Sequence, residues 1–148
     1  MSSFFQALYR PVERWSLLKR GTFSHNSPIK TYKNIYTLGM KYVEFRGSSL
    51  SDLRDFPQTA MRDAGHQLDK VQNGLSADDV KPMPTIGAGV MELRIWDEAG
   101  TFRVVYVAKF GDAVYVLHCF KKKTPQTSQP DIELARKRFK ELVKEISK

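Results

Sequence analysis

The stretch VMELRIWDEAGTFRVVYVAKFGDAVYVLHCFKKK, residues 90–123, determines the fold of this chain. It holds three runs of apolar residues, at 90–96, 101–110 and 113–121, and each run has the composition of a β-strand. Short turns join the runs, so we expect the three strands to pair as an antiparallel meander. Arginines within the runs and three lysines after them point to an anionic ligand such as RNA, because sheet stability does not require cations there.

The segments on either side of this stretch add one strand and three helices. Residues 41–46 alternate as a strand, and a short helix follows it. A second helix begins near Pro57 and ends at Asn73-Gly74, before an irregular connection at 75–89. Asp131 can cap a last, amphipathic helix. We therefore predict an α+β fold, with a helical pair packed on one face of an antiparallel sheet and a C-terminal helix.

The charge of the chain is unevenly distributed. The 148 residues carry a net charge of +8, which favours nucleic acid or another polyanion as a partner. Residues 1–39 contain six Lys or Arg and one acidic residue, and Met40 stands directly before the first strand pattern. We interpret 1–39 as a basic N-terminal extension, either flexible or the product of an upstream start, and 40–148 as the functional domain.

Several classes of protein are not favoured by the composition. A single cysteine, Cys119, cannot form an internal disulfide, so a reducing cytoplasm is the expected compartment. The sequence contains no run of about 18 apolar residues, which is the length that a membrane-spanning helix requires. His25 and His66 are isolated from plausible metal partners, so we expect no metal and no cofactor.

Pairing the strands through their turns predicts a polar surface. If Trp96 opposes Thr101, then Arg94 opposes Arg103; if Phe110 opposes Ala113, then Phe120 opposes Arg103 and His118 lies diagonal to it. Two opposed arginines repel each other, unless the surface receives a phosphate or Glu92 neutralises Arg103. The same alternation predicts one apolar face, which consists of Met91, Leu93, Ile95, Phe102, Val104, Tyr106, Tyr115, Leu117 and Cys119.

Two further cationic features have more than one reading. His118 within an apolar strand is either a structural residue or a neutral general base whose pKa falls beside two arginines. Lys121, Lys122 and Lys123 form either a solvated strand end or a clamp for RNA phosphates.

Six segments carry a resemblance to a known family: Leu53–Pro57, Gln67–Leu75, Lys81–Arg94, Phe102–Lys109, Val116–Thr124 and Asp131–Ala135. Through them, residues from about 41 to 141 resemble the phage-derived HigB-like toxins of the RelE/ParE superfamily of type II toxin–antitoxin systems. The resemblance implies a RelE-like fold and a ribosome-dependent mRNA endoribonuclease that a helix-turn-helix antitoxin neutralises in a hetero-oligomer. In that superfamily a ribose 2′-hydroxyl attacks the adjacent phosphate.

The resemblance also implies roles for individual residues. Arg103 matches the arginine of the central strand that stabilises the phosphate, and Arg94 matches the basic residue of the preceding strand. Lys121 or Lys122 corresponds to the basic residue after the last strand, while His118 is a hypothetical general base. No tyrosine or histidine follows His118, so no residue near the C-terminus is assigned the proton transfers. Two alternatives remain: a ParE-like toxin that binds DNA gyrase, and an inactive partner that binds an antitoxin.

Overall fold

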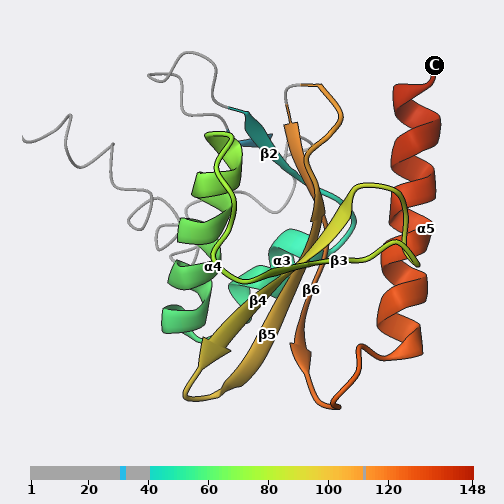
Figure 1. Ribbon diagram of the computed structural model, residues 1–148. Coiled ribbons are helices and arrows are strands. Elements are labelled where there is room, and N and C mark those ends of the chain that lie inside the picture. Colours follow the sequence, from blue (N-terminus) through green and yellow to red (C-terminus); the bar gives the residue numbers. More distant parts are fainter. Residues whose placement is uncertain (1–30, 33–40, 112) are drawn as a thin grey trace, which may run out of the picture.

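The computed structural model describes residues 31–32, 41–111 and 113–148 (Figure 1). The predicted division between 1–39 and 40–148 falls on residues outside this range, except that Thr31–Tyr32 pair with the first core strand. The elements in chain order are β1 (Thr31–Tyr32), β2 (Tyr42–Phe45), α3 (Ser49–Arg54), α4 (Gln58–Gln72), β3 (Val80–Pro82), β4 (Val90–Asp97), β5 (Gly100–Val107), β6 (Ala113–Lys122) and α5 (Gln129–Ile146).

The predicted α+β class is confirmed, and the strands form one sheet with the order β1-β2-β6-β5-β4-β3. The expected antiparallel meander is present as β4, β5 and β6. The sheet as a whole is mixed, because β2 pairs with β6 in parallel. That parallel pair is possible because α3, α4 and the meander lie between the two strands in the sequence, and parallel neighbours need a long crossover.

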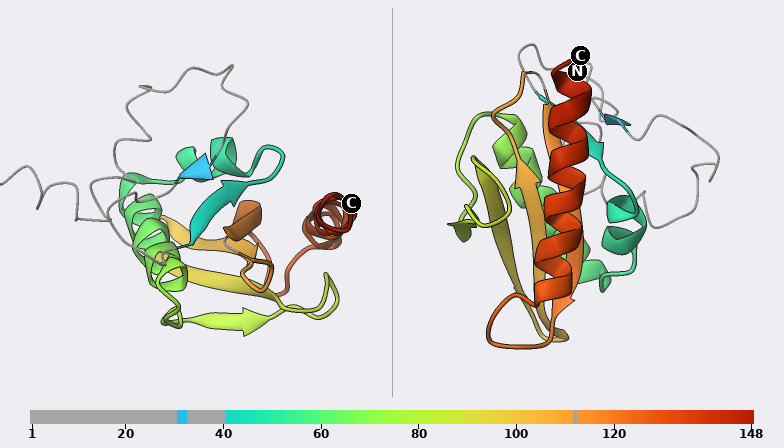
Figure 2. Two further views of the ribbon diagram at one scale, coloured as in Figure 1. Left: turned by 90° about the horizontal axis from the view of Figure 1, so that it is seen from above. Right: turned by 90° about the vertical axis from the view of Figure 1, so that its right-hand side faces the viewer.

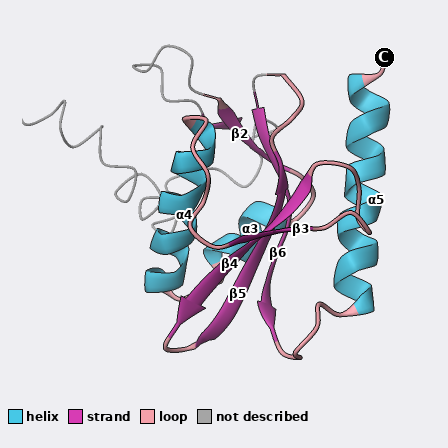
Figure 3. Cartoon of the chain, in the orientation of Figure 1, coloured by secondary structure: helices cyan, strands magenta, loops and turns pink. Residues whose placement is uncertain are grey.

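Helices cover both faces of the sheet (Figures 1 and 2). The predicted pair, α3 and α4, packs on one face, and α5 packs on the opposite face (Figure 3). Burying both faces divides the core into two clusters. The larger cluster, on the α3–α4 side, includes Leu53, Met61, Leu68, Leu93, Val104, Val116 and Cys119. The cluster beneath α5 includes Val90, Val105, Val107, Leu117, Ala135 and Leu142.

The predicted faces of some β6 side chains are wrong, because the strand contains a β-bulge. Val105 pairs with His118, but Tyr106 pairs with Val116, so Leu117 is the extra residue. The one-residue shift places Tyr115 and Leu117 in the cluster beneath α5, not on the apolar face with Cys119 as predicted. The predicted pairing of Phe110 with Ala113 is also wrong, because β5 ends at Val107, opposite Tyr115.

The connection predicted as irregular at 75–89 contains the short edge strand β3. Its three residues pair antiparallel with β4, with Val80 opposite Leu93. Pro82 is tolerated because an edge strand leaves one side unpaired. Three residues with a proline give too weak a pattern for the sequence to reveal the strand. Farther along this connection, Gly87 lets α5 approach closely, since a Cβ there would lie 2.2 Å from the Phe139 ring.

Candidate functional site

The predicted register of the polar residues is confirmed. Arg94 lies opposite Arg103, Arg103 lies opposite Phe120, and His118 lies opposite Val105 in the next row. All of these residues are on the face that α5 covers. Arg103 is 3% exposed and His118 is 6% exposed, so both side chains are buried.

Arg103 forms a buried ion pair with Glu92. Its Nε lies 3.3 Å from Glu92 Oε1 without hydrogen-bond geometry, and its Nη1 donates to the carbonyl of Phe102 at 3.1 Å. Burial lowers the pKa of Arg103 from its ordinary value, and the charge of Glu92 opposes that shift. The Thr127 hydroxyl donates to the other Glu92 oxygen at 2.8 Å. The neutralising role that we considered for Glu92 is therefore present in the structure.

Arg94 is held by a different carboxylate. Its Nε donates to Asp79 Oδ1 at 2.7 Å, and the indole Nε1 of Trp96 donates to Asp79 Oδ2, also at 2.7 Å. These two bonds, with that from Trp96 the larger cause, lower the pKa of Asp79. The two opposed arginines are thus paired with separate carboxylates, which reduces their mutual repulsion. The side chain of Arg94 keeps 37% of its surface exposed.

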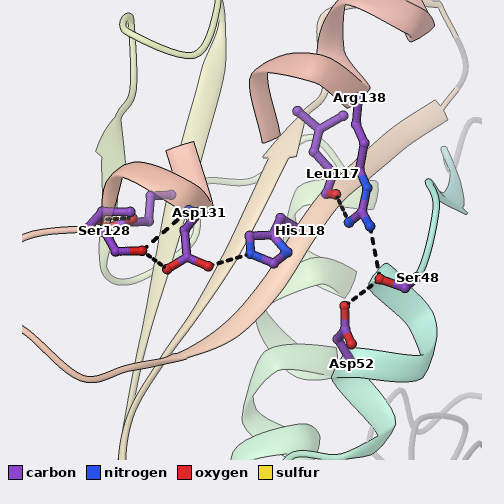
Figure 4. A network of polar contacts seen from close by, with 9 residues as sticks. Ser48, Asp52, Leu117, His118, Ser128, Asp131 and Arg138 are labelled. Atoms are coloured by element: carbon purple, nitrogen blue, oxygen red, sulfur yellow. Dashed lines mark hydrogen bonds and ion pairs between the residues drawn. The ribbon is translucent and has the colours of Figure 1, made fainter. Parts of the chain in front are cut away.

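His118 is part of a polar network at the start of α5 (Figure 4). Its Nε2 lies 2.7 Å from Asp131 Oδ1, and the hydroxyl of Ser128 donates to the other oxygen of that carboxylate. Ser128 also caps the helix by accepting from the backbone N–H of Asp131. The His118 ring stacks on Phe120 with centroids 4.9 Å apart. Asp131 therefore joins the helix N-terminus to the strand and fixes the imidazole.

A cavity of about 560 Å³ opens beside this network. Alternation along β6 directs Lys122 to the same face as Arg103, whereas Lys121 lies on the opposite face with its Nζ 5.9 Å from the Phe102 ring centre. Within the described part of the chain, no carboxylate forms an ion pair with Lys122 or Lys123. The cavity is lined by Phe120, Lys121, Lys122, Lys123, Thr124, Gln126, Ser128 and Asp131.

Arg138 fixes the β-bulge next to this site. Its Nη1 donates to the carbonyl of Leu117, the extra residue of the bulge, at 2.8 Å, and its Nη2 donates to Ser48 Oγ at 2.9 Å (Figure 4). Arg138 thereby ties α5 both to β6 and to the start of α3.

The comparison with protein families gives a match over the meander and most of the helices around it. The family described as Phage derived protein Gp49-like (DUF891) matches residues 51–140. The chain belongs to this Gp49-like family. The family is associated with toxin–antitoxin systems and is RelE/HigB-like. A comparison with curated proteins finds no match. The family match spans α4, β3 and the meander, and it ends within α5.

The Gp49-like domain brings together some residues that the sequence did not connect. We interpreted Asp131 only as a helix cap, and Asp79 falls within the connection at 75–89 that we interpreted as irregular. Each of these carboxylates binds a predicted site residue. The position of Asp79 could have been predicted only by recognising strand β3, because the pairing of Val80 with Leu93 brings Asp79 beside Arg94. No comparable sequence signal links Asp131 to His118, because a loop and a helix turn separate them.

Two further properties concern the described residues alone. No group of three or more His, Cys, Asp and Glu side chains among them is arranged to hold a metal ion. No helix in the same part of the Gp49-like chain is both long and apolar enough to cross a membrane.

Proposed function

We propose that this chain is the toxin of a type II toxin–antitoxin system and that it cleaves mRNA on the ribosome. Membership of the Gp49-like family supports the toxin assignment. The observation that carries the nuclease assignment is the cavity at the end of β6, which Lys122, Lys123 and Asp131 line together. Cations that can hold a phosphate are thereby placed beside a group that can accept a proton.

The proposed reaction is an attack by a ribose 2′-hydroxyl on the adjacent phosphorus. The O2′–P bond forms and the P–O5′ bond breaks, leaving a 2′,3′-cyclic phosphate and a 5′-hydroxyl. The 2′-hydroxyl proton passes to Asp131, and the leaving 5′-oxygen takes a proton from water. The side chain of Asp131 is 27% exposed and that of His118 is only 8% exposed. His118 therefore does not contact the RNA and instead holds the Asp131 carboxylate in position. The sequence-based role of His118 as general base becomes a positioning role.

The cationic residues have different parts in this proposal. Lys122 contacts the phosphate directly and stabilises the charge that develops on it. Arg94, which is partly exposed, helps to orient the RNA, together with Lys123. Lys121, expected from the sequence to bind RNA as well, has its ammonium on the opposite face of the sheet, against the Phe102 ring. Arg103 is buried and its charge is balanced by Glu92, so it supports the strand beneath the site instead of making the direct phosphate contact implied by the resemblance.

The partners that follow from the proposal are a cognate helix-turn-helix antitoxin, the ribosome and mRNA in the cytoplasm. The toxin-associated family supports an antitoxin partner, which would form a hetero-oligomer with this chain.

The test is induction of the full chain in bacteria without its antitoxin. We expect growth arrest and mRNA cuts within translated codons, with 5′-hydroxyl ends. Lys122→Ala and Asp131→Asn should each reduce cleavage about 100-fold. Lys144→Ala is the matched control, because Lys144 is exposed on α5 and does not line the cavity, and it should cleave like the wild type.

Three outcomes would contradict the proposal. Intact transcripts with altered DNA supercoiling would favour the gyrase-binding alternative. Harmless induction, with or without residues 1–39, would favour an inactive antitoxin-binding partner. Full cleavage by both cavity variants would place the reaction elsewhere on the chain.

A further inference from the structure

Trp96 is a large aromatic residue that the fold leaves in solvent. It lies near the end of β4 and is 64% exposed. A single exposed apolar side chain needs no special explanation. Trp96 differs from such a residue because two neighbours, Asp79 and Arg103, define where its ring lies.

The ring of Trp96 is fixed at its edge and supported from one side. Asp79 accepts the indole N–H at 2.7 Å and is itself bonded to Arg94. The guanidinium carbon of the buried Arg103 lies 5.5 Å from the ring centre, within the range of a cation–π contact. A ring held in this way loses little conformational freedom when a ligand stacks on it, so binding is not offset by an ordering cost.

The sheet register places Trp96 in line with the proposed phosphate contact. Trp96 lies opposite Thr101, and Thr101 lies opposite Lys122, so the three residues form one row on the same face. Neighbouring strands are about 4.8 Å apart, which puts the backbones of Trp96 and Lys122 about 10 Å apart. A short single strand laid across β4, β5 and β6 can bridge that distance.

The charges around the row leave one cation available to a polyanion. Arg94, Arg103 and Lys122 lie in the row of Trp96 or in the row next to it. Asp79 and Glu92 pair with the two arginines, whereas no carboxylate among the described residues pairs with Lys122. The nearby carboxylate of Asp97 is engaged by the Thr59 hydroxyl of α4 at 2.5 Å, on the other side of the sheet. Proteins that bind single-stranded nucleic acid combine aromatic platforms with a basic track in this manner.

We infer that Trp96 is a stacking platform for an unpaired base of single-stranded RNA whose phosphate contacts Lys122. The inference rests on the proposed function in that the RNA is the substrate, but it concerns binding and can be tested without cleavage. The ring provides a π-face that accepts any base, so the contact supplies affinity and placement without sequence preference.

The first experiment measures the fluorescence of Trp96. Trp15 is the only other tryptophan in the sequence, so Trp15→Phe in the full chain isolates the signal. We expect single-stranded hexauridylate to quench this fluorescence, because a base stacks on the indole. An abasic oligonucleotide of the same length supplies phosphates only and should leave it unchanged.

The second experiment compares affinities for labelled hexauridylate by anisotropy at several salt concentrations. Trp96→Leu should bind about 10-fold more weakly with an unchanged salt dependence, and Trp96→Phe should retain most of the affinity. Lys122→Ala is the matched control for charge, and it should lower the slope of log affinity against log salt by about one. Thermal unfolding of each variant verifies that the fold is retained.

The outcomes separate this inference from the proposed function. Unchanged RNA affinity in Trp96→Leu overturns the inference, whatever the wild type does to mRNA. Loss of antitoxin binding with unchanged RNA affinity would assign Trp96 to a protein interface and also overturns it. Trp96-dependent RNA binding without mRNA cuts on induction would support the platform while the nuclease proposal fails.

Discussion

Arg94 and Arg103 face each other across β4 and β5, and each guanidinium has its own carboxylate, Asp79 for the first and Glu92 for the second. The two carboxylates come from different places, a loop residue before β3 and a residue within β4. Their environments also differ, because the Arg103–Glu92 pair is buried and the Arg94–Asp79 pair is about one-third exposed. Disrupting the two pairs should therefore have different consequences.

Breaking the buried pair should destabilise the fold. Arg103→Met leaves the Glu92 carboxylate 2% exposed and without its counter-ion, which should lower the free energy of unfolding by about 3–5 kcal/mol. Adding Glu92→Gln removes the unpaired charge and keeps an acceptor for Thr127, so the double variant should recover part of the loss. Urea unfolding gives the free energy of unfolding of the wild type, of each single variant and of the double variant. Additive effects of the two substitutions would show that the residues are not coupled.

Arg103 is a poor probe of function for the same reason. Arg103→Ala would abolish toxicity through lost stability alone, so it does not report on RNA chemistry by itself. Lys122 is the better probe, because its side chain is partly exposed and lines the cavity.

The exposed pair should contribute a dependence of stability on pH. The pKa of Asp79 is lowered in the folded chain from its ordinary value of 3.8, so the unfolded chain binds more protons in acid. The contribution is complete above the unfolded pKa and is lost as the pH falls through the folded pKa, within about pH 5 to 2. Asp79→Asn should flatten this part of the curve of unfolding free energy against pH. An identical curve for the variant and the wild type would refute the assignment.

The close approach of Arg138 to the backbone predicts different costs at two glycines. Gly47 has φ 55°, and a Cβ there would lie 2.5 Å from Arg138 Nε; Gly74 has φ 78°, and nothing would lie within 4 Å of its Cβ. Gly74→Ala should cost about 1–2 kcal/mol from the left-handed backbone alone. Gly47→Ala should cost at least about 1 kcal/mol more, because Arg138 must give up its bonds to Leu117 and Ser48. Equal losses in thermal or urea unfolding would contradict this.

The only thiol of the chain should be inert in the folded state. Cys119 is 2% exposed, and burial raises the pKa of its thiol above the ordinary value of 9.0. We expect a thiol reagent at pH 8 to label Cys119 only as fast as the protein unfolds. The control is the protein in denaturant, which should react at once, and rapid labelling of the folded chain would show that the site opens without unfolding.

Periodicity revealed most of the fold. Strands have a period of two, so the meander, its turns and the opposition of Arg94 and Arg103 could all be predicted from 90–123. The bulge at Leu117 could not, because an extra residue leaves no mark in an apolar run and is stabilised by Arg138, 21 positions later. It reversed the faces of Tyr115 and Leu117 but left the register of His118 and Phe120 intact.

The α+β class, the antiparallel meander and the set of cations on one face all follow from local spacing along the chain. Which of these cations reach solvent follows instead from the packing of distant elements. His118 is buried where α5 packs against β6, and Arg103 is buried in its pair with Glu92, while the end of the sheet leaves Trp96 exposed and Lys122 accessible at the cavity. Burial depends on which elements pack together, and a helix that begins seven residues after the last strand can cover either face. The packing of the elements therefore distinguishes residues that support the site from residues that can contact a ligand.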